Sequence, residues 1–247
     1  MFDANKEIDG IVNWIRGWFE SNGPKASAVI GLSGGKDSSI VATLLVEALG
    51  KDRVVGVMMP NGNQVDINDS IEIASHLGIK TYTVNIKSSY DAFLDTLQES
   101  VNDIEITKDT KINLAPRLRM STLYAIAQSL PNGGRVANTC NASEDYVGYS
   151  TKYGDAAGDF SPCANYTVTE MRCIGDALQV PHNLVHKEPS DGLSGMSDED
   201  KLGFTYAALD DYIMQGKCDD EKLKDRFDYL HKINLHKLEA IPAYTRH

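Results

Sequence analysis

The 247-residue chain has 42% hydrophobic and 24% charged residues, a composition typical of a globular domain with a substantial core. Its formal net charge of −11 argues against broad binding to nucleic acid or to an anionic membrane. No apolar run reaches membrane-spanning length, and Asp3, Glu7 and Asp9 stand where a signal peptide would be basic and apolar. We therefore expect a cytoplasmic protein that forms one large α/β domain or a domain with an appendage, and the charge does not exclude anionic small molecules as ligands.

The N-terminal segment has the spacing of an amphipathic helix that ends at Asn22-Gly23-Pro24. Its apolar face is expected either in the core, which is the more common case, or in a dimer interface. The face consists of Ile8, Ile11, Val12, Ile15, Trp18 and Phe19.

The next stretch predicts a buried strand, a tight turn and a helix. An apolar run fills residues 26–31, a Ser-Gly-Gly turn occupies residues 33–35, and helical spacing covers residues 38–49. Backbone N–H groups in a glycine turn and at a helix start attract anions. This stretch is therefore a candidate phosphate-binding loop.

The loop is not a Walker P-loop. Only three residues separate Gly31 from Gly35, where that motif has four, and Asp37 stands where it has Ser or Thr. This makes Lys36 a poor candidate for a phosphate-clamping lysine. The Ser33–Ser38 pattern instead resembles the pyrophosphate loop of ATP pyrophosphatases, which cleave ATP into AMP and pyrophosphate. An acid inside such a loop suits Mg²⁺ binding, and the alternative is a purely structural turn of small residues.

Strand and helix patterns alternate along the first half of the chain. This alternation predicts an α/β fold with a doubly wound, mostly parallel sheet and helices on both faces. Further strands are expected at residues 53–60, 80–86 and 135–139, with helices from Asp66 or Asn68 to Leu77, at 90–99 and at 113–130.

The second half of the chain is predicted to be helices joined by long loops. Pro116 suits the first turn of the helix expected at residues 113–130. The Gly-, Asp- and Pro-rich residues 151–162 predict a loop, and residues 189–196 also carry turn residues. Helices are expected at residues 167–178, 197–214 and 219–235.

Six motifs, in order along the chain, resemble those of the short, ammonia-dependent NAD synthetases. The resemblance covers nearly the whole chain and implies a single ATP pyrophosphatase domain over residues 1–247, similar to the adenine nucleotide alpha hydrolases, with no glutaminase domain. The motifs are the loop at residues 31–38, Asn113-x-x-x-Arg117-x-Arg119-Met120, Thr139-x-Asn141-x-Ser143-Glu144, Thr151-Lys152-Tyr153-Gly154-Asp155, Lys187-Glu188-Pro189-Ser190 and His236-Lys237.

The resemblance implies ATP-dependent amidation of deamido-NAD. The nicotinate carboxylate would attack the α-phosphate of ATP, releasing pyrophosphate and forming a mixed anhydride with AMP. Ammonia would then attack the activated carbonyl group, giving NAD and AMP. Family members of this type are homodimers, and neither nucleic acid nor a membrane is an expected partner.

Residue roles follow from the matched positions. The family implies ATP contacts from Gly31, Leu32, Ser33, Gly34, Gly35, Lys36, Asp37, Ser38, Thr139, Val168 and Ser190. Asp37 and Glu144 match the Mg²⁺ ligands, and Asp155 is the candidate catalytic residue that orients the nicotinate end or the incoming amine. Arg117, Lys152, Asp159, His236 and Lys237 match deamido-NAD contacts.

One position departs from the family pattern. Val168 stands where many members have a lysine that touches an ATP phosphate, and Lys187 is a candidate substitute for that lysine.

Two alternative functions are weighed against NAD synthesis. The first is another ATP pyrophosphatase, such as the amination domain of GMP synthetase or a tRNA-thiolating enzyme. The acidic charge and the lack of a Cys-x-x-Cys pair oppose thiolation, and residues 151–155 oppose GMP synthesis. The second is a nucleotide sensor without chemistry, which the joint presence of Asp37 and Glu144 opposes.

Overall fold

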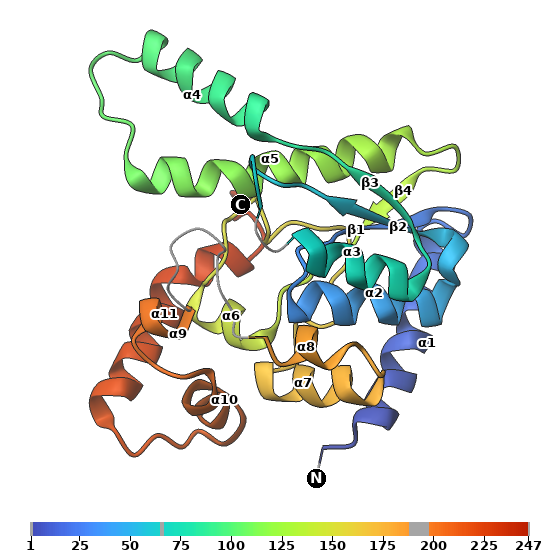
Figure 1. Cartoon of the computed structure of the whole chain (residues 1–247). Helices are drawn as coiled ribbons and strands as arrows, with labels where there is room; N and C mark the ends of the chain where they lie inside the picture. Colours follow the sequence, from blue (N-terminus) through green and yellow to red (C-terminus); the bar gives the residue numbers. More distant parts are fainter. Residues whose placement is uncertain (1, 65–66, 188–197, 247) are drawn as a thin grey trace.

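The protein is built around a four-stranded parallel sheet with strand order β3-β2-β1-β4 (Figure 1). The computed structural model describes residues 2–64, 67–187 and 198–246. The predicted α/β class with a parallel sheet is confirmed. The strands are β1 (Ser27–Gly31), β2 (Val54–Met58), β3 (Lys80–Thr83) and β4 (Gly134–Val136).

The strand order creates a switch point between β1 and β4. From β1 the chain adds β2 and then β3 on one side, and it later returns to add β4 on the other side. Loops diverge at such a point and leave room for a ligand beyond the carboxyl ends of the strands. The loop that follows Gly31 begins at this point, and Ala137 leaves β4 beside it, with its N–H donating to the Val29 carbonyl at 2.9 Å.

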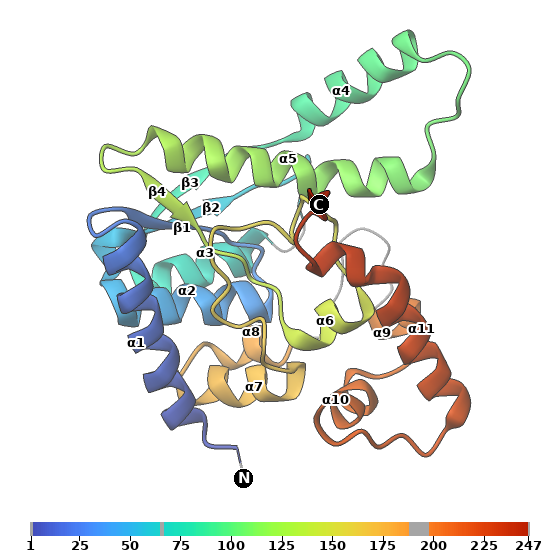
Figure 2. The same cartoon turned by 180° about the vertical axis from the view of Figure 1, so that it is seen from behind.

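Helices cover both faces of the sheet, as predicted (Figures 1 and 2). Side chains alternate along β1, so that Ala28 and Ile30 belong to one core layer and Val29 to the other. The first layer is covered by α1 (Ala4–Asn22), α2 (Lys36–Leu49), α3 (Ile67–Leu77), α7 (Val168–Ala177) and α8 (His182–Val185), and the second by α4 (Lys87–Ser100) and α5 (Lys108–Ser129).

The apolar face of α1 belongs to the core. Ile11, Val12, Ile15 and Phe19 are buried against the layer that contains α2 and α7. The Asp3 side chain caps the helix start by accepting a hydrogen bond from the Lys6 N–H. Of the two readings of this stripe, the core interpretation is therefore confirmed.

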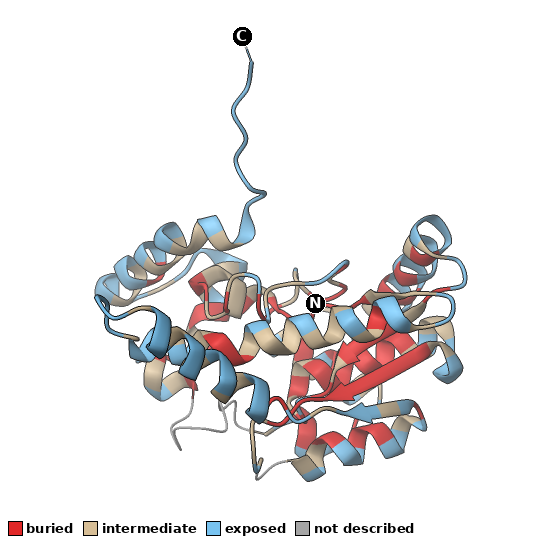
Figure 3. Cartoon of the chain, turned by 90° about the horizontal axis from the view of Figure 1, so that it is seen from above, coloured by how far each residue is buried: buried red, intermediate tan, exposed pale blue. Residues whose placement is uncertain are grey.

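The C-terminal helices form a smaller lobe with its own core. It contains α6 (Ala142–Val147), α9 (Asp198–Leu202), α10 (Tyr206–Gln215) and α11 (Glu221–Leu238). Residues 240–246 beyond α11 are exposed and lead away from the folded body (Figure 3). A short 3₁₀ helix (Lys51–Arg53) precedes β2.

Several predicted boundaries were wrong. α5 starts at Lys108, where Thr107 caps it, so Pro116 lies inside the helix rather than in its first turn. The helix expected at residues 197–214 is broken at Gly203, which has φ +78° and separates α9 from α10. Asn68 lies within α3 and does not cap it. The alternative cap Asp66 and the segment 189–197 lie outside the described residues.

Two further short helices, α6 and α8, were not predicted. Within the described residues, none of the helices has both the length and the apolar character needed to cross a bilayer.

Candidate active site

The loop between β1 and α2 is held in shape by its own hydroxyl groups. The Oγ atoms of Ser33 and Ser38 lie 3.0 Å apart, and the Gly35 N–H donates to Ser33 Oγ at 3.2 Å. Gly34 adopts φ +77°, a left-handed conformation that favours glycine. Gly35 caps α2 without a side-chain hydrogen bond, so the first N–H groups of this helix remain available to an anion.

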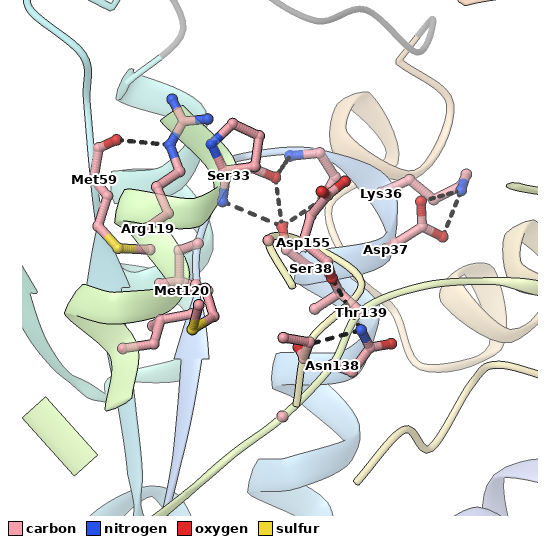
Figure 4. Close-up of a pocket in the computed structure, with 18 of the residues that line it drawn as sticks. Ser33, Lys36, Asp37, Ser38, Met59, Arg119, Met120, Asn138, Thr139 and Asp155 are labelled. Carbon is pink, nitrogen blue, oxygen red and sulfur yellow. Dashed lines mark hydrogen bonds and ion pairs between the residues drawn. The ribbon is translucent and has the colours of Figure 1, made fainter. Parts of the chain in front are cut away.

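This loop forms one wall of a cavity of about 410 Å³ (Figure 4). Other parts of the lining come from α5, from the residues after β4 and from the loop around Asp155. The cavity brings together ten of the predicted site residues, namely Gly31, Leu32, Ser33, Gly35, Lys36, Asp37, Ser38, Thr139, Glu144 and Asp155.

Carboxylates crowd the floor of this cavity. Burial of its carboxyl group and the nearby charge of Asp37 raise the pKa of Glu144 well above its ordinary value, while Lys36 opposes that shift. Asn141 places Glu144 there by capping α6, since its Oδ1 accepts the Glu144 N–H at 3.0 Å. Lys36 Nζ lies 2.5 Å from Asp37 Oδ1 and is almost fully buried. The two predicted metal ligands therefore lie close enough for the charge of Asp37 to oppose ionisation of Glu144.

This donor set fits a magnesium ion that arrives with a nucleotide. Mg²⁺ is commonly held by one or two carboxylates together with phosphate oxygens and water. Asp37 and Glu144 supply two carboxylates, and the described residues contain no group of three or more His, Cys, Asp or Glu side chains able to hold a metal by themselves.

Asp155 lines the same cavity as the loop and belongs to the segment that follows α6 (Figure 4). The Thr151 N–H donates to Asp155 Oδ1 at 2.8 Å and fixes the carboxylate. Burial raises the pKa of the Asp155 carboxyl group. The hydrogen bonds from Thr151 and the positive charge of Lys237 act in the opposite direction. The oxygens of such a buried carboxylate can accept a hydrogen bond from an incoming amine.

Two charged residues of the cavity lining had no role in the sequence-based prediction. Arg119 lies in the lining, where its Nε donates to the Met59 carbonyl at 3.1 Å. Asp198 is buried beside Glu144 and accepts a hydrogen bond from the Tyr149 hydroxyl at 2.9 Å. Arg119 had a signal, because it belongs to the motif from which only Arg117 was chosen. Asp198 stands in none of the recognised motifs.

The predicted deamido-NAD residues lie outside this lining and mostly form a second cluster. Arg117 Nε donates to the Lys152 carbonyl at 3.3 Å, and Lys152 Nζ donates to the His236 carbonyl. Lys237 Nζ donates to the carbonyls of Gly148 and Ser150 at 2.6 and 3.0 Å. This cluster ties the C-terminal end of α11 to the loop that precedes Asp155.

Asp159 is placed apart from that cluster. Its carboxylate accepts the Val136 N–H at 2.7 Å and the Tyr124 hydroxyl at 3.2 Å, which ties the loop to the end of β4. The substrate roles of Asp159 and of the second cluster stay predictions.

Val168 does not reach the cavity. Its side chain is 1% exposed in the core of the C-terminal lobe, and its N–H donates to Ser143 Oγ at 3.0 Å. The ATP contact predicted for Val168 stays a prediction. Lys187, the suggested substitute for the family lysine, does line the cavity. The predicted ATP contact Ser190 lies outside the described residues, and Gly34 packs against α3 beneath the loop.

The fold and the site are typical of nucleotide-binding α/β proteins, with a candidate anion-binding loop and two carboxylates at the switch point of a doubly wound sheet. A family model described as NAD synthase matches residues 7–245, and the chain belongs to the NAD synthase family.

Named relatives agree with this assignment. The chain is 37% identical to the NH(3)-dependent NAD(+) synthetase of Alkaliphilus metalliredigens over 94% of each sequence. Among solved structures, the NMN synthetase of Francisella tularensis superposes with a TM-score of 0.90 at 34% identity, with all of both chains covered. The NH3-dependent NAD synthetase of Campylobacter jejuni superposes with a TM-score of 0.78 at 26% identity, covering 99% of this chain and 100% of that one.

Proposed function

We propose that this chain is a ligase that uses ATP and ammonia to amidate deamido-NAD, giving NAD, AMP and pyrophosphate. Its family and the names of its curated relatives support this reaction. The observation that carries the proposal is one cavity that joins the anion-binding loop, the carboxylates of Asp37 and Glu144, and Asp155.

The reaction can be derived from what the cavity residues do. Hydroxyl and N–H groups of the loop bind the β- and γ-phosphates, which orients the α-phosphate toward the nicotinate carboxylate. Asp37 and Glu144 would hold Mg²⁺, which supplies neutralisation of the phosphate charge as pyrophosphate leaves. Asp155 accepts a hydrogen bond from ammonia and directs its lone pair at the adenylated carbonyl group. No protein nucleophile takes part.

The same proposal includes a cytoplasmic homodimer. α4 and the adjoining part of α5 project from the body (Figure 1), and Phe93 and Ile112 on them are each 50% exposed. Apolar side chains on a projecting arm favour a second copy of the chain as the partner.

A second candidate function is the amidation of nicotinate mononucleotide. It is favoured by the TM-score of 0.90 with a protein named NMN synthetase, against 0.78 with one named NAD synthetase. It is also favoured because Lys152 and Lys237, two of the predicted dinucleotide contacts, bind backbone carbonyls outside the cavity.

One competition experiment separates these functions. The protein is incubated with ATP, Mg²⁺ and ammonium, and with equimolar deamido-NAD, nicotinate mononucleotide and XMP. We expect NAD to accumulate together with an equal amount of AMP. NMN as the main product would establish the second candidate, and GMP would reject both. The Asp37→Ala variant, which lacks one proposed metal ligand, is the inactive control.

A further inference from the structure

Three cationic side chains line the cavity within the described part of the chain, and each is held by a different partner. Both Asp37 oxygens hold Lys36, at 2.5 and 2.6 Å from Nζ, and its side chain is only 4% exposed. Arg119 is anchored to the Met59 carbonyl on the other side of the cavity. Lys187 is the third, and it approaches from the chain that follows α8.

The Lys187 ammonium lies beside the anion-binding loop. Its Nζ is 2.5 Å from Asp69 Oδ2, in the first turn of α3, and the two side chains keep 30% and 27% exposure. That turn packs directly on the loop, because a Cβ on Gly34 would lie 2.6 Å from Asp69 Cβ. Ser70 Oγ also donates to the Leu32 carbonyl at 3.1 Å. The ion pair therefore borders the loop on its α3 side.

The cavity needs such a cation to bind a triphosphate. Its lining has four carboxylates, from Asp37, Glu144, Asp155 and Asp198, against the three cations. A cation beside the loop would offset this excess of acids.

We propose that Lys187 binds the pyrophosphate portion of ATP and that Asp69 holds its ammonium group in place before the nucleotide arrives. The long flexible stem of lysine lets Nζ exchange the carboxylate for a phosphate oxygen without movement of the backbone. Asp69 remains stabilised after the exchange by the positive end of the α3 dipole. The proposal rests on the proposed function only in taking ATP as the nucleotide.

The test measures binding without turnover. Dissociation constants of Mg·ATP, AMP and inorganic pyrophosphate are determined by calorimetry for the unaltered protein and for Lys187→Met, Lys187→Arg, Asp69→Asn and the exposed control Lys25→Met. Lys187→Met is expected to weaken ATP and pyrophosphate about tenfold or more, while the AMP constant stays within about twofold. Lys187→Arg should recover most of the loss.

Asp69→Asn is expected to change the affinity for pyrophosphate in the opposite direction from Lys187→Met. Because the Asp69 carboxylate no longer competes with the phosphate for the Lys187 ammonium, this variant should bind pyrophosphate about two- to fivefold more tightly. A purely structural ion pair would instead make Asp69→Asn and Lys187→Met alike. Equal ATP affinity in Lys187→Met and Lys25→Met, or equal losses for ATP and AMP, would overturn the proposal. If the chain bound ATP in this way but formed neither NAD nor NMN, the proposed function would fail and this inference would stand.

Discussion

Glu144 shows how a single residue links ligand binding to stability. Its buried carboxyl group faces the charge of Asp37, so the ionised form destabilises the protein that holds no ligand. Near neutral pH, folding must therefore protonate this carboxyl group, whose pKa is raised to about 8, and Glu144→Gln removes that cost while keeping the shape and the backbone bond to Asn141. We expect its melting temperature in EDTA to rise by about 2–4 °C, as a gain of about 1 kcal/mol does in a domain of this size.

The same substitution should abolish stabilisation by Mg·ATP as well as turnover, because one carboxylate is lost from the proposed metal site. Thermal scans with and without Mg·ATP measure both effects, and the exposed Glu105→Gln serves as the control. A Glu144→Gln protein that still gained stability from Mg·ATP as the unaltered protein does would contradict the metal assignment.

At the residue scale, local motifs predicted the loop side of the cavity but not the opposite wall. Gly31, Asp37 and Ser38 are near neighbours in sequence, so their spacing is enough to place them together. Arg119 and Asp198 reach the cavity through the packing of α5 and α9, which a motif does not encode. On a helix, Arg117 and Arg119 lie two positions apart and point in different directions, so the motif alone did not choose between them.

At the element scale, the packing of α11 onto α6 depends on one glycine. Gly148 caps α6 with φ +66°, and a Cβ there would lie 2.2 Å from Asn234 Cβ on α11. Gly216 caps α10 with the same φ of +66°, but a Cβ there would meet nothing within 4 Å. The two positions therefore share backbone strain and differ in the space around them.

We expect Gly148→Ala to cost about 1–3 kcal/mol of unfolding free energy beyond the cost of Gly216→Ala, which is the range for overpacking. Urea denaturation of both variants measures the difference. Equal losses would show that α11 can shift away from α6 at little cost.

Gly148→Ala should also affect substrate binding. Lys237 and Lys152 join α11 to the loop before Asp155, so we expect the variant to bind deamido-NAD more weakly while its affinity for ATP changes less.

The order of strands and helices could be predicted because apolar periodicity is a local signal. The errors arose where tertiary packing decides the boundary. Pro116 occurs inside α5 because that helix continues outward along α4, beyond the part that covers the sheet. The break at Gly203 lets Phe204 enter the core of the C-terminal lobe, a contact made with residues far away in the sequence.

At the scale of the whole molecule, the projecting arm predicts self-association. We expect a homodimer at micromolar concentration, measured by sedimentation velocity, because Phe93 and Ile112 expose apolar surface on the arm. Phe93→Glu should shift the protein toward the monomer, whereas Tyr244→Glu, in the exposed C-terminal tail, should leave the dimer intact. A monomeric unaltered protein, or equal dissociation in both variants, would contradict this interface.

The central claim is that the cavity at the switch point transfers AMP from ATP to a nicotinate carboxylate. The most direct measurement uses deamido-NAD whose nicotinate carboxylate carries ¹⁸O in both positions, with ATP, Mg²⁺ and ammonium. When the mixed anhydride is cleaved by ammonia, one carboxylate oxygen stays on phosphorus. The account predicts one ¹⁸O in each AMP formed, with pyrophosphate unlabelled. Amide product accompanied by unlabelled AMP, or by ADP and phosphate, would contradict it.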